Sequence, residues 1–214
     1  MSDVKFNIAV YQNVPQLVLG FHGCDEENAK RVLEDPRGHL YTSRNDYDWL
    51  GDGIYFWLND PQRAYEWAVE RSKSSKSNVK KPAVIGAVID LGVCMNLCER
   101  ESIMLLQKSY QDLEAAAEEA GLNIQEEFQN KVPDAGGFSR VRYLDCIVIR
   151  HAHDMIEEEG RSFDTVYGYF QEGGAAYPGS DIREKSHIQI AVRNLNCIKG
   201  YFSPLEPNEN YAMP

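Results

Sequence analysis

Three short segments hold the residues best suited to chemistry. His22-Gly23 ends an apolar run, Gly53-Ile54-Tyr55-Phe56 opens a second run, and Gln189 lies in a third run near the carboxyl end. An imidazole has a donor side and an acceptor side, and a glycine permits close approach to the backbone because it lacks Cβ. The amide of Gln189 accepts a hydrogen bond but carries no charge. Each segment therefore offers a group that could bind or orient a ligand.

Other clusters of reactive side chains are less informative. His151-Ala152-His153 has the residue type of a metal ligand, but residues two apart on a helix do not share a face, and no third ligand follows at a useful spacing. The five cysteines are an odd number without the spacing of a disulfide framework or a zinc site. We predict no metal site and five reduced thiols.

The segment 48–67 predicts a turn, a strand and a helix in immediate succession. Gly51-Asp52-Gly53 is typical of a turn, and the aromatic and β-branched residues 54–57 favour a strand. Asn59 or Asp60 can cap a helix that starts at Pro61 and runs to about Arg71. A strand held between a glycine turn and a capped helix presents its side chains at a fixed rim.

The remaining pattern predicts an α+β protein. Strands are expected at 16–21, 83–91, 163–170 and 188–192, with 198–202 extending or pairing with the last; helices are expected at 26–34, 99–120 and 142–159, and loops at 39–48 and 171–186. Strands alternate with helices early in the chain and follow one another late, which favours α+β over a regular βαβ winding. Neither common glycine-rich phosphate loop is present.

Length and composition set the broad class. The 214 residues, 43% of them hydrophobic, fit one domain over 1–204, with a helical insertion at about 95–160 and a tail at 205–214. The net charge of −11 disfavours a nucleic-acid partner, since phosphates are bound by Lys and Arg. No signal pattern and no run near the roughly 20 apolar residues of a membrane span is present, so we expect a cytoplasmic protein without a membrane partner.

The three segments resemble the ADP-ribosyltransferases of the diphtheria-toxin and poly(ADP-ribose) polymerase branch. Members carry a strand ending in His-Gly-Ser or His-Gly-Thr, a strand with Gly-x-Gly-Ile-Tyr-Phe before a helix with small residues, and a late strand with Glu behind a loop. This chain has Phe21-His22-Gly23-Cys24, Gly51-Asp52-Gly53-Ile54-Tyr55-Phe56 and His187-Ile188-Gln189-Ile190-Ala191-Val192. The resemblance covers residues 17–70 and 185–203, and implies a split, mainly antiparallel sheet with flanking helices around an NAD cleft.

The resemblance also implies roles for residues of the first two segments. His22 would hydrogen-bond a ribose hydroxyl of NAD, and Gly23 would hold the nicotinamide carboxamide through its backbone N–H and C=O. Tyr55 would pack on the nicotinamide face, with Tyr65 or Trp67 as a second aromatic opposite. Each residue keeps a structural alternative: a histidine satisfied in the core, a turn glycine, or an aromatic core strand.

Gln189 departs from the family, which has Glu at this position. A carboxylate would stabilise by its charge the oxocarbenium-like transition state of nicotinamide–ribose cleavage, whereas Gln offers only a hydrogen bond. Glu172 or Glu184 in the preceding loop could supply a nearby carboxylate, and the structural alternative for Gln189 is a solvent-facing strand residue. Ser43, with Arg44 beside it, would reach the adenosine side or a phosphate.

The function implied by the resemblance is mono-ADP-ribosylation with NAD as co-substrate. ADP-ribose would pass to a macromolecular acceptor, a protein rather than a nucleic acid, and nicotinamide would be released. Toxins and defence effectors often use this fold, so an antitoxin or inhibitor protein is a further expected partner. The neutral Gln189 leaves two alternatives open: an NAD glycohydrolase, with water as acceptor, and an inactive NAD-binding or interaction module.

Overall fold

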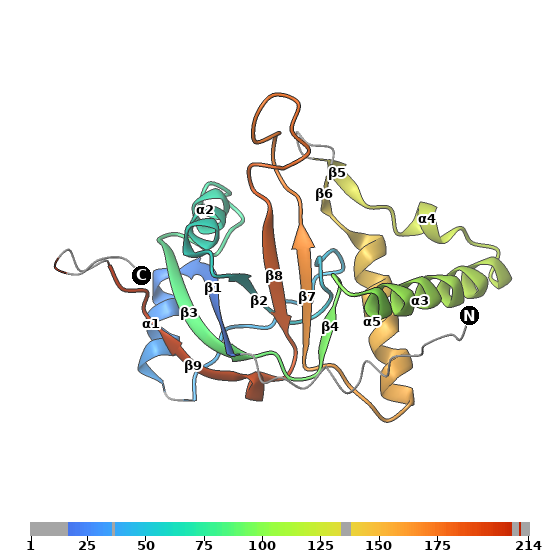
Figure 1. Cartoon of the computed structure of the whole chain (residues 1–214), viewed down its shortest axis with the longest axis horizontal. Helices are drawn as coiled ribbons and strands as arrows, with labels where there is room; N and C mark the ends of the chain where they lie inside the picture. Colours follow the sequence, from blue (N-terminus) through green and yellow to red (C-terminus); the bar gives the residue numbers. More distant parts are fainter. Residues whose placement is uncertain (1–16, 36, 134–137, 207–209, 211–214) are drawn as a thin grey trace, which may run out of the picture.

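The chain forms one seven-stranded sheet with helices on both faces. The computed structural model describes residues 17–35, 37–133, 138–206 and 210 (Figure 1). The strands are β1 (Leu17–Asp25), β2 (Ile54–Leu58), β3 (Pro82–Asp90), β4 (Cys94–Asn96), β5 (Lys131–Pro133), β6 (Ser139–Val141), β7 (Thr165–Phe170), β8 (His187–Val192) and β9 (Ile198–Phe202). The helices are α1 (Glu26–Glu34), α2 (Pro61–Ser72), α3 (Arg100–Glu119), α4 (Ile124–Glu127) and α5 (Tyr143–Glu158), with a 3₁₀ turn at Leu195–Cys197.

The order of strands in the large sheet is β4-β7-β8-β2-β1-β3-β9, and β5 and β6 form a separate hairpin. Within the large sheet β4 and β7 are parallel, and the other neighbouring pairs are antiparallel. The predicted α+β class with a mainly antiparallel sheet and flanking helices is confirmed. Most of the predicted tail at 205–214, and residue 16 of the first predicted strand, lie outside the described residues.

Local capping signals place α1 and α2 as predicted. The side chain of Asp25 accepts a hydrogen bond from the Glu27 N–H at 3.1 Å, and that of Asp60 accepts one from the Arg63 N–H at 2.8 Å. Asp60, rather than Asn59, is therefore the cap of α2, and Pro61 is its first residue. Such caps satisfy N–H groups that lack a partner within the first helical turn.

The predicted partner of the last strand was wrong. Residues 198–202 form β9, but β9 pairs with β3, with Phe202 opposite Gly86, and does not extend or pair with β8. Both edges of β8 are already occupied by β2 and β7. In the sequence, the 3₁₀ turn at Leu195–Cys197 links β8 to β9. Strand β9 then forms the edge of the sheet that lies opposite β4 (Figure 1).

The two faces of the sheet bury different residues of β2. Ile54 and Phe56 belong to the core cluster that also contains Val32 of α1. Trp57 packs with Ala64 of α2, and Tyr55 packs against the cluster around α5 and β7. Because successive side chains of a strand alternate between faces, Tyr55 and Trp57 share the face covered by α2 and α5.

Helices α3 and α5 lie beside the β4–β7 end of the sheet (Figure 1). A buried hydrogen bond from the Ser109 hydroxyl to the Val148 carbonyl, 2.7 Å long, joins these two helices. Ile149 and Ala152 of α5 pack against Met95 of β4 and Val166 of β7. Within the described ranges, no helix combines the length and apolar character needed to cross a membrane.

Candidate active site at the β1–β2 split

Strands β1 and β2 pair over only a short length and then part. The Leu19 carbonyl accepts from the Asn59 N–H at 3.0 Å, and Phe21 lies opposite Trp57. This register ends at Phe21, and we call that point the β1–β2 split. Alternate residues of a strand direct their N–H and C=O groups to the same side, so Gly23 presents its backbone edge toward β2, where no residue is in register with it.

His22 fills the position where the two strands part. Its Nδ1 lies 2.7 Å from the Tyr55 carbonyl oxygen. That oxygen can only accept, so Nδ1 carries the proton, and burial lowers the pKa of His22 and keeps the ring neutral. The Nε2 of this tautomer is a lone-pair acceptor, which suits a hydroxyl group of a ligand.

Gly23 has a structural reason to be glycine. A Cβ at this position would lie 2.1 Å from the Ala64 carbonyl oxygen, so α2 approaches β1 only because no side chain intervenes. The space beside its Cα therefore belongs to α2, and any ligand contact is left to the backbone edge. Binding of a carboxamide by that edge stays a prediction.

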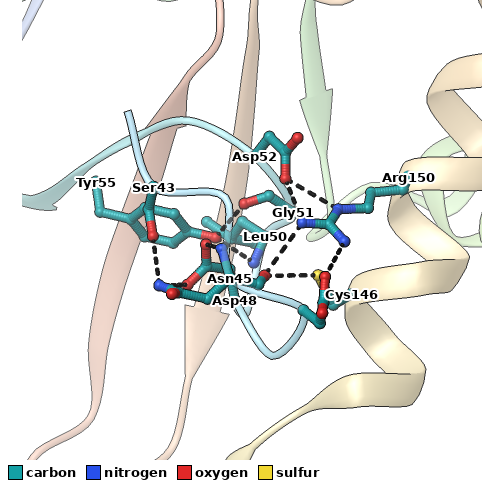
Figure 2. Close-up of polar contacts among 10 residues, drawn as sticks. Ser43, Asn45, Asp48, Leu50, Gly51, Asp52, Tyr55, Cys146 and Arg150 are labelled. Atoms are coloured by element: carbon teal, nitrogen blue, oxygen red, sulfur yellow. Dashed lines mark hydrogen bonds and ion pairs between the residues drawn. The ribbon is translucent and has the colours of Figure 1, made fainter. Parts of the chain in front are cut away.

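Tyr55 is bound through its hydroxyl to the glycine turn. The oxygen accepts from the Leu50 N–H at 2.8 Å and donates to the Gly51 carbonyl at 2.6 Å (Figure 2). Burial raises the pKa of Tyr55 well above the usual value for a phenol. The predicted stacking residue is thus held rigidly by the turn that precedes it.

A network anchored on α5 holds the same turn in place, and no local sequence pattern predicted it. Arg150 donates through Nε and Nη2 to one oxygen of Asp52, at 2.9 and 2.7 Å, and through Nη1 to Asp46 at 2.9 Å (Figure 2). Its Nη2 also donates to the Asn45 carbonyl. Helix α5 therefore positions the turn from about a hundred residues away in the sequence.

We expect Tyr55→Phe to destabilise the fold by about 2 kcal/mol, because the Leu50 N–H and the Gly51 carbonyl would both lose their hydroxyl partner. Urea unfolding followed by circular dichroism measures the change. The matched control is Tyr169→Phe: Tyr169 is 49% exposed, and loss of its hydroxyl should cost less than about 0.5 kcal/mol. Equal effects in the two variants would contradict the anchoring role.

The other predicted NAD-binding residues, Trp67, Tyr65 and Ser43, lie at different distances from the split. The Trp67 ring lies 6.5 Å from that of His22 and 5.9 Å from that of Trp57, whereas Tyr65 is 45% exposed. Of the two aromatics left open by the sequence, Trp67 is the one beside the split. Ser43 pairs with Gly53 through two backbone hydrogen bonds, and its hydroxyl accepts from Asn45, so it lies next to the glycine turn.

Gln189 lies on the same face of the sheet as Tyr55 and Trp57. It is opposite Trp57 in β2 and opposite Gly168 in β7, and only 8% of its surface is exposed. The solvent-facing alternative for this side chain is therefore wrong, because the residue is buried. The structure thus brings the third segment to the first two.

A buried polar cluster surrounds that part of β8, and of its members only Glu172 was among the residues for which the sequence suggested a role. Arg63 Nη2 and Glu172 Oε2 are 2.6 Å apart, and the same carboxylate oxygen is 3.8 Å from His187 Nδ1. The Arg63 guanidinium lies 5.9 Å from the centre of the Trp57 ring. Glu184, the other carboxylate considered, lies instead beside Gly174. The sequence pattern that could have indicated burial of Arg63 is its position next to Ala64 and near Trp67, on the side of α2 that faces the sheet.

A separate groove of about 680 Å³ opens between α3 and α5. Its lining is largely apolar and includes Trp49, Leu106, Arg142, Val148 and Phe170. The Trp49 ring also stacks at 6.2 Å on His187. This groove therefore borders the polar cluster, and its lining does not include His22, Gly23 or Tyr55 of the β1–β2 split.

His151 and His153 both lie on α5, away from the split. Among the described residues, no group of three or more His, Cys, Asp or Glu side chains is arranged to hold a metal ion. His153 is 2% exposed, its ring packs against Phe163 at 5.8 Å, and burial lowers its pKa to about 3.

This buried histidine predicts an acid-dependent loss of stability. An unfolded imidazole ionises near pH 6.5, whereas folded His153 stays neutral down to about pH 3. Between these values the unfolded chain binds a proton that the fold excludes, so stability falls as the pH drops. We expect about 2 kcal/mol to be lost between pH 7 and pH 5 from this residue. His153→Phe should flatten the pH dependence in urea titrations, and an unchanged slope would contradict the assignment.

Comparisons with known proteins add little to this geometry. No family model matches the chain. An uncharacterized protein of Methanocaldococcus jannaschii, MJ0359, is 31% identical over 88 residues, which is 41% of this chain and 36% of that protein. The chain thus spans about a third of the length of this relative. No solved structure matches.

Proposed function

We propose that the protein is an ADP-ribosyltransferase that binds NAD at the β1–β2 split and transfers ADP-ribose to a macromolecular acceptor. The observation that carries the proposal is the end of pairing between β1 and β2 at His22-Gly23. There His22 directs Nδ1 to the Tyr55 carbonyl, and the backbone edge of Gly23 has no partner in β2. The resemblance to the diphtheria-toxin and poly(ADP-ribose) polymerase branch supports the same site.

The side chains at the split suit the parts of NAD in distinct ways. The Nε2 lone pair of His22 accepts from a ribose hydroxyl, and the N–H and C=O of Gly23 pair with a carboxamide. The Tyr55 ring, held by Leu50 and Gly51, offers a rigid surface to an aromatic ring, with Trp67 as the second aromatic. Ser43 lies beside the glycine turn, on the side proposed for the adenosine.

In the proposed reaction the bond between ribose C1′ and the nicotinamide nitrogen of NAD breaks, and its electron pair leaves with nicotinamide. The acceptor nucleophile then bonds to C1′ and releases its proton. Gln189 orients the ribose by hydrogen bonding but contributes no charge to the transition state. This favours slow transfer of a single ADP-ribose unit. Because Gln189 is 8% exposed, entry of the ligand requires movement of the groups that cover it.

The acceptor is proposed to be a protein rather than a nucleic acid, because the net charge of −11 repels phosphates. A toxin or defence effector in the cytoplasm, with an antitoxin or inhibitor protein, is the context that the resemblance favours. Hydrolysis of NAD, with water as acceptor, and NAD binding without turnover are the two alternatives that Gln189 supports.

The test is release of labelled nicotinamide from NAD by the purified protein, with and without cell lysate. NAD labelled in the adenylate part follows the other product. Label on protein supports the transferase, label on nucleic acid would change the acceptor class, and free ADP-ribose alone would indicate a glycohydrolase. Stabilisation by NAD in a thermal melt without any product would indicate a binding module.

Site variants then test the location. His22→Ala should abolish release of nicotinamide and weaken NAD binding by about tenfold, the effect of one strong hydrogen bond. The control is His39→Ala, since His39 bonds the Tyr201 hydroxyl, distant from the split. If NAD binds equally well to His22→Ala and to the unmodified protein, the site is elsewhere.

A further inference from the structure

Several buried polar atoms beside Gln189 have no hydrogen-bond partner within the described part of the chain. They include Trp57 Nε1, Arg63 Nε and Nη1, and His187 Nε2. The three residues are 4%, 6% and 6% exposed and come from β2, α2 and β8. A buried polar group without a partner loses its hydrogen bonds to water and gains none in return, so proteins seldom leave four such atoms together.

These atoms belong to one cluster. The Trp57 and His187 rings are 6.2 Å apart, and the Arg63 guanidinium is 5.9 Å from the Trp57 ring. Glu172 joins Arg63 and His187 at its edge. A single group of a few atoms could therefore reach polar atoms from all three elements.

The hydrogen-bonding character of the cluster is mixed. Trp57 Nε1 and the Arg63 nitrogens can only donate. The Nδ1 of His187 lies 2.6 Å from the Lys185 carbonyl, so Nδ1 carries the proton, and burial lowers the pKa of the ring. The free Nε2 is therefore an acceptor. A complementary ligand needs an oxygen that accepts more than one hydrogen bond and an N–H or O–H that donates one.

The charges favour a neutral ligand. Arg63 faces two carboxylates, Glu172 at 2.6 Å and Glu66 at 4.0 Å, and His187 is neutral, so the cluster has no uncompensated positive charge. An added carboxylate or phosphate would face the Glu172 carboxylate and an imidazole lone pair. A carboxamide avoids both repulsions, because its oxygen has two lone pairs and its nitrogen donates.

We propose that Trp57, Arg63 and His187 form a subsite for the side-chain amide of an Asn or Gln residue of the acceptor protein. The amide oxygen accepts from Trp57 Nε1 and Arg63, and the amide N–H donates to His187 Nε2. The cluster adjoins loop 171–186 and Gln189, whereas the Gly23 edge serves the carboxamide of nicotinamide. The amide subsite stands on the unpartnered atoms alone, and only its identity as the acceptor subsite rests on the proposed function.

The test observes the indole N–H signals of the ¹⁵N-labelled full chain in two-dimensional NMR. The chain has three tryptophans, and loss of a signal in Trp57→Phe assigns the one of interest. Propanamide serves as the model of a Gln side chain. We expect propanamide to shift the Trp57 signal in a saturable way. The affinity derived from this shift should be about tenfold weaker in His187→Phe, in line with the loss of one hydrogen bond.

Two comparators of similar size identify the ligand class. Propionate has the same carbon skeleton, but its carboxylate is charged and has no N–H to donate, so its affinity should be at least about tenfold weaker. Nicotinamide tests whether the amide belongs to NAD instead. Arg63→Gln combined with Glu172→Gln, which removes both charges together, should weaken the propanamide response. Arg140→Gln is the matched control, because Arg140 pairs with Glu70 on the surface, where both side chains are about half exposed.

No shift with propanamide, a propionate response as strong, or a response to nicotinamide alone would each overturn the assignment. These measurements contain no NAD, so they can succeed even if the protein proves unable to cleave it. Conversely, nicotinamide release without any propanamide response would leave the proposed function standing and refute the amide subsite.

Discussion

Gln189→Glu should speed the release of nicotinamide from NAD by tenfold or more, on the order expected for one added electrostatic contact to a developing charge. The new carboxylate would keep the reach of the amide and add a negative charge to the face of β8 that also carries His187. Burial would raise the pKa of the introduced Glu. Trp57 lies opposite position 189 in β2, and the Arg63 guanidinium near the Trp57 ring would favour the ionised form of the Glu. Initial rates with labelled NAD at pH 7 to 8 measure the effect.

The matched control for this gain is Gln125→Glu, the same substitution at an exposed position of α4, which should leave the rate unchanged. Thermal melts of both variants show whether the fold is kept. A folded Gln189→Glu protein that releases nicotinamide more slowly than the original would mean that Gln189 does not occupy the position of the family's glutamate.

Arg63→Ala should destabilise the fold by about 3–5 kcal/mol, which is the typical cost of leaving one member of a buried ion pair without its partner. The Glu172 side chain is only 14% exposed, so water cannot replace the guanidinium 2.6 Å away. Urea titration followed by circular dichroism gives the free energy of unfolding. A loss below about 1 kcal/mol would contradict the buried character of the pair.

A double variant separates the charge from the packing. Arg63→Met with Glu172→Met replaces both charges by apolar side chains of similar length, and buried pairs so replaced are often neutral or more stable. We therefore expect it to recover most of the stability lost in Arg63→Ala. On the surface, Arg140→Ala breaks the pair with Glu70 and should cost less than about 1 kcal/mol.

Elements with local signals were predictable from the sequence. Asp25 and Asp60 cap α1 and α2 because their side chains reach N–H groups two or three residues away. The glycine turn before Tyr55 follows from the left-handed backbone at Gly51, with φ of 70°. Each of these interactions lies within one turn or one cap, so a short stretch of sequence contains both partners.

Contacts between distant segments were not predictable in the same way. The pairing of β9 with β3 depends on β8 already having two neighbours, which no pattern within 198–202 reveals. The anchoring of the glycine turn by Arg150 and the link from Arg63 to Glu172 each join residues about a hundred positions apart. Their side chains look like ordinary surface charges until the fold brings them together.

The sequence by itself determined the α+β class, the capped helices and the glycine turn before β2, because these depend on local hydrogen bonds and on the alternation of apolar residues. Only the tertiary structure decided that β1 and β2 part at His22, that Gly23 makes room for α2, and that Gln189 is buried beside Arg63, Glu172 and His187. The physical reason is that burial and the pairing of charges depend on which distant elements pack together, and those elements are set by the whole sheet.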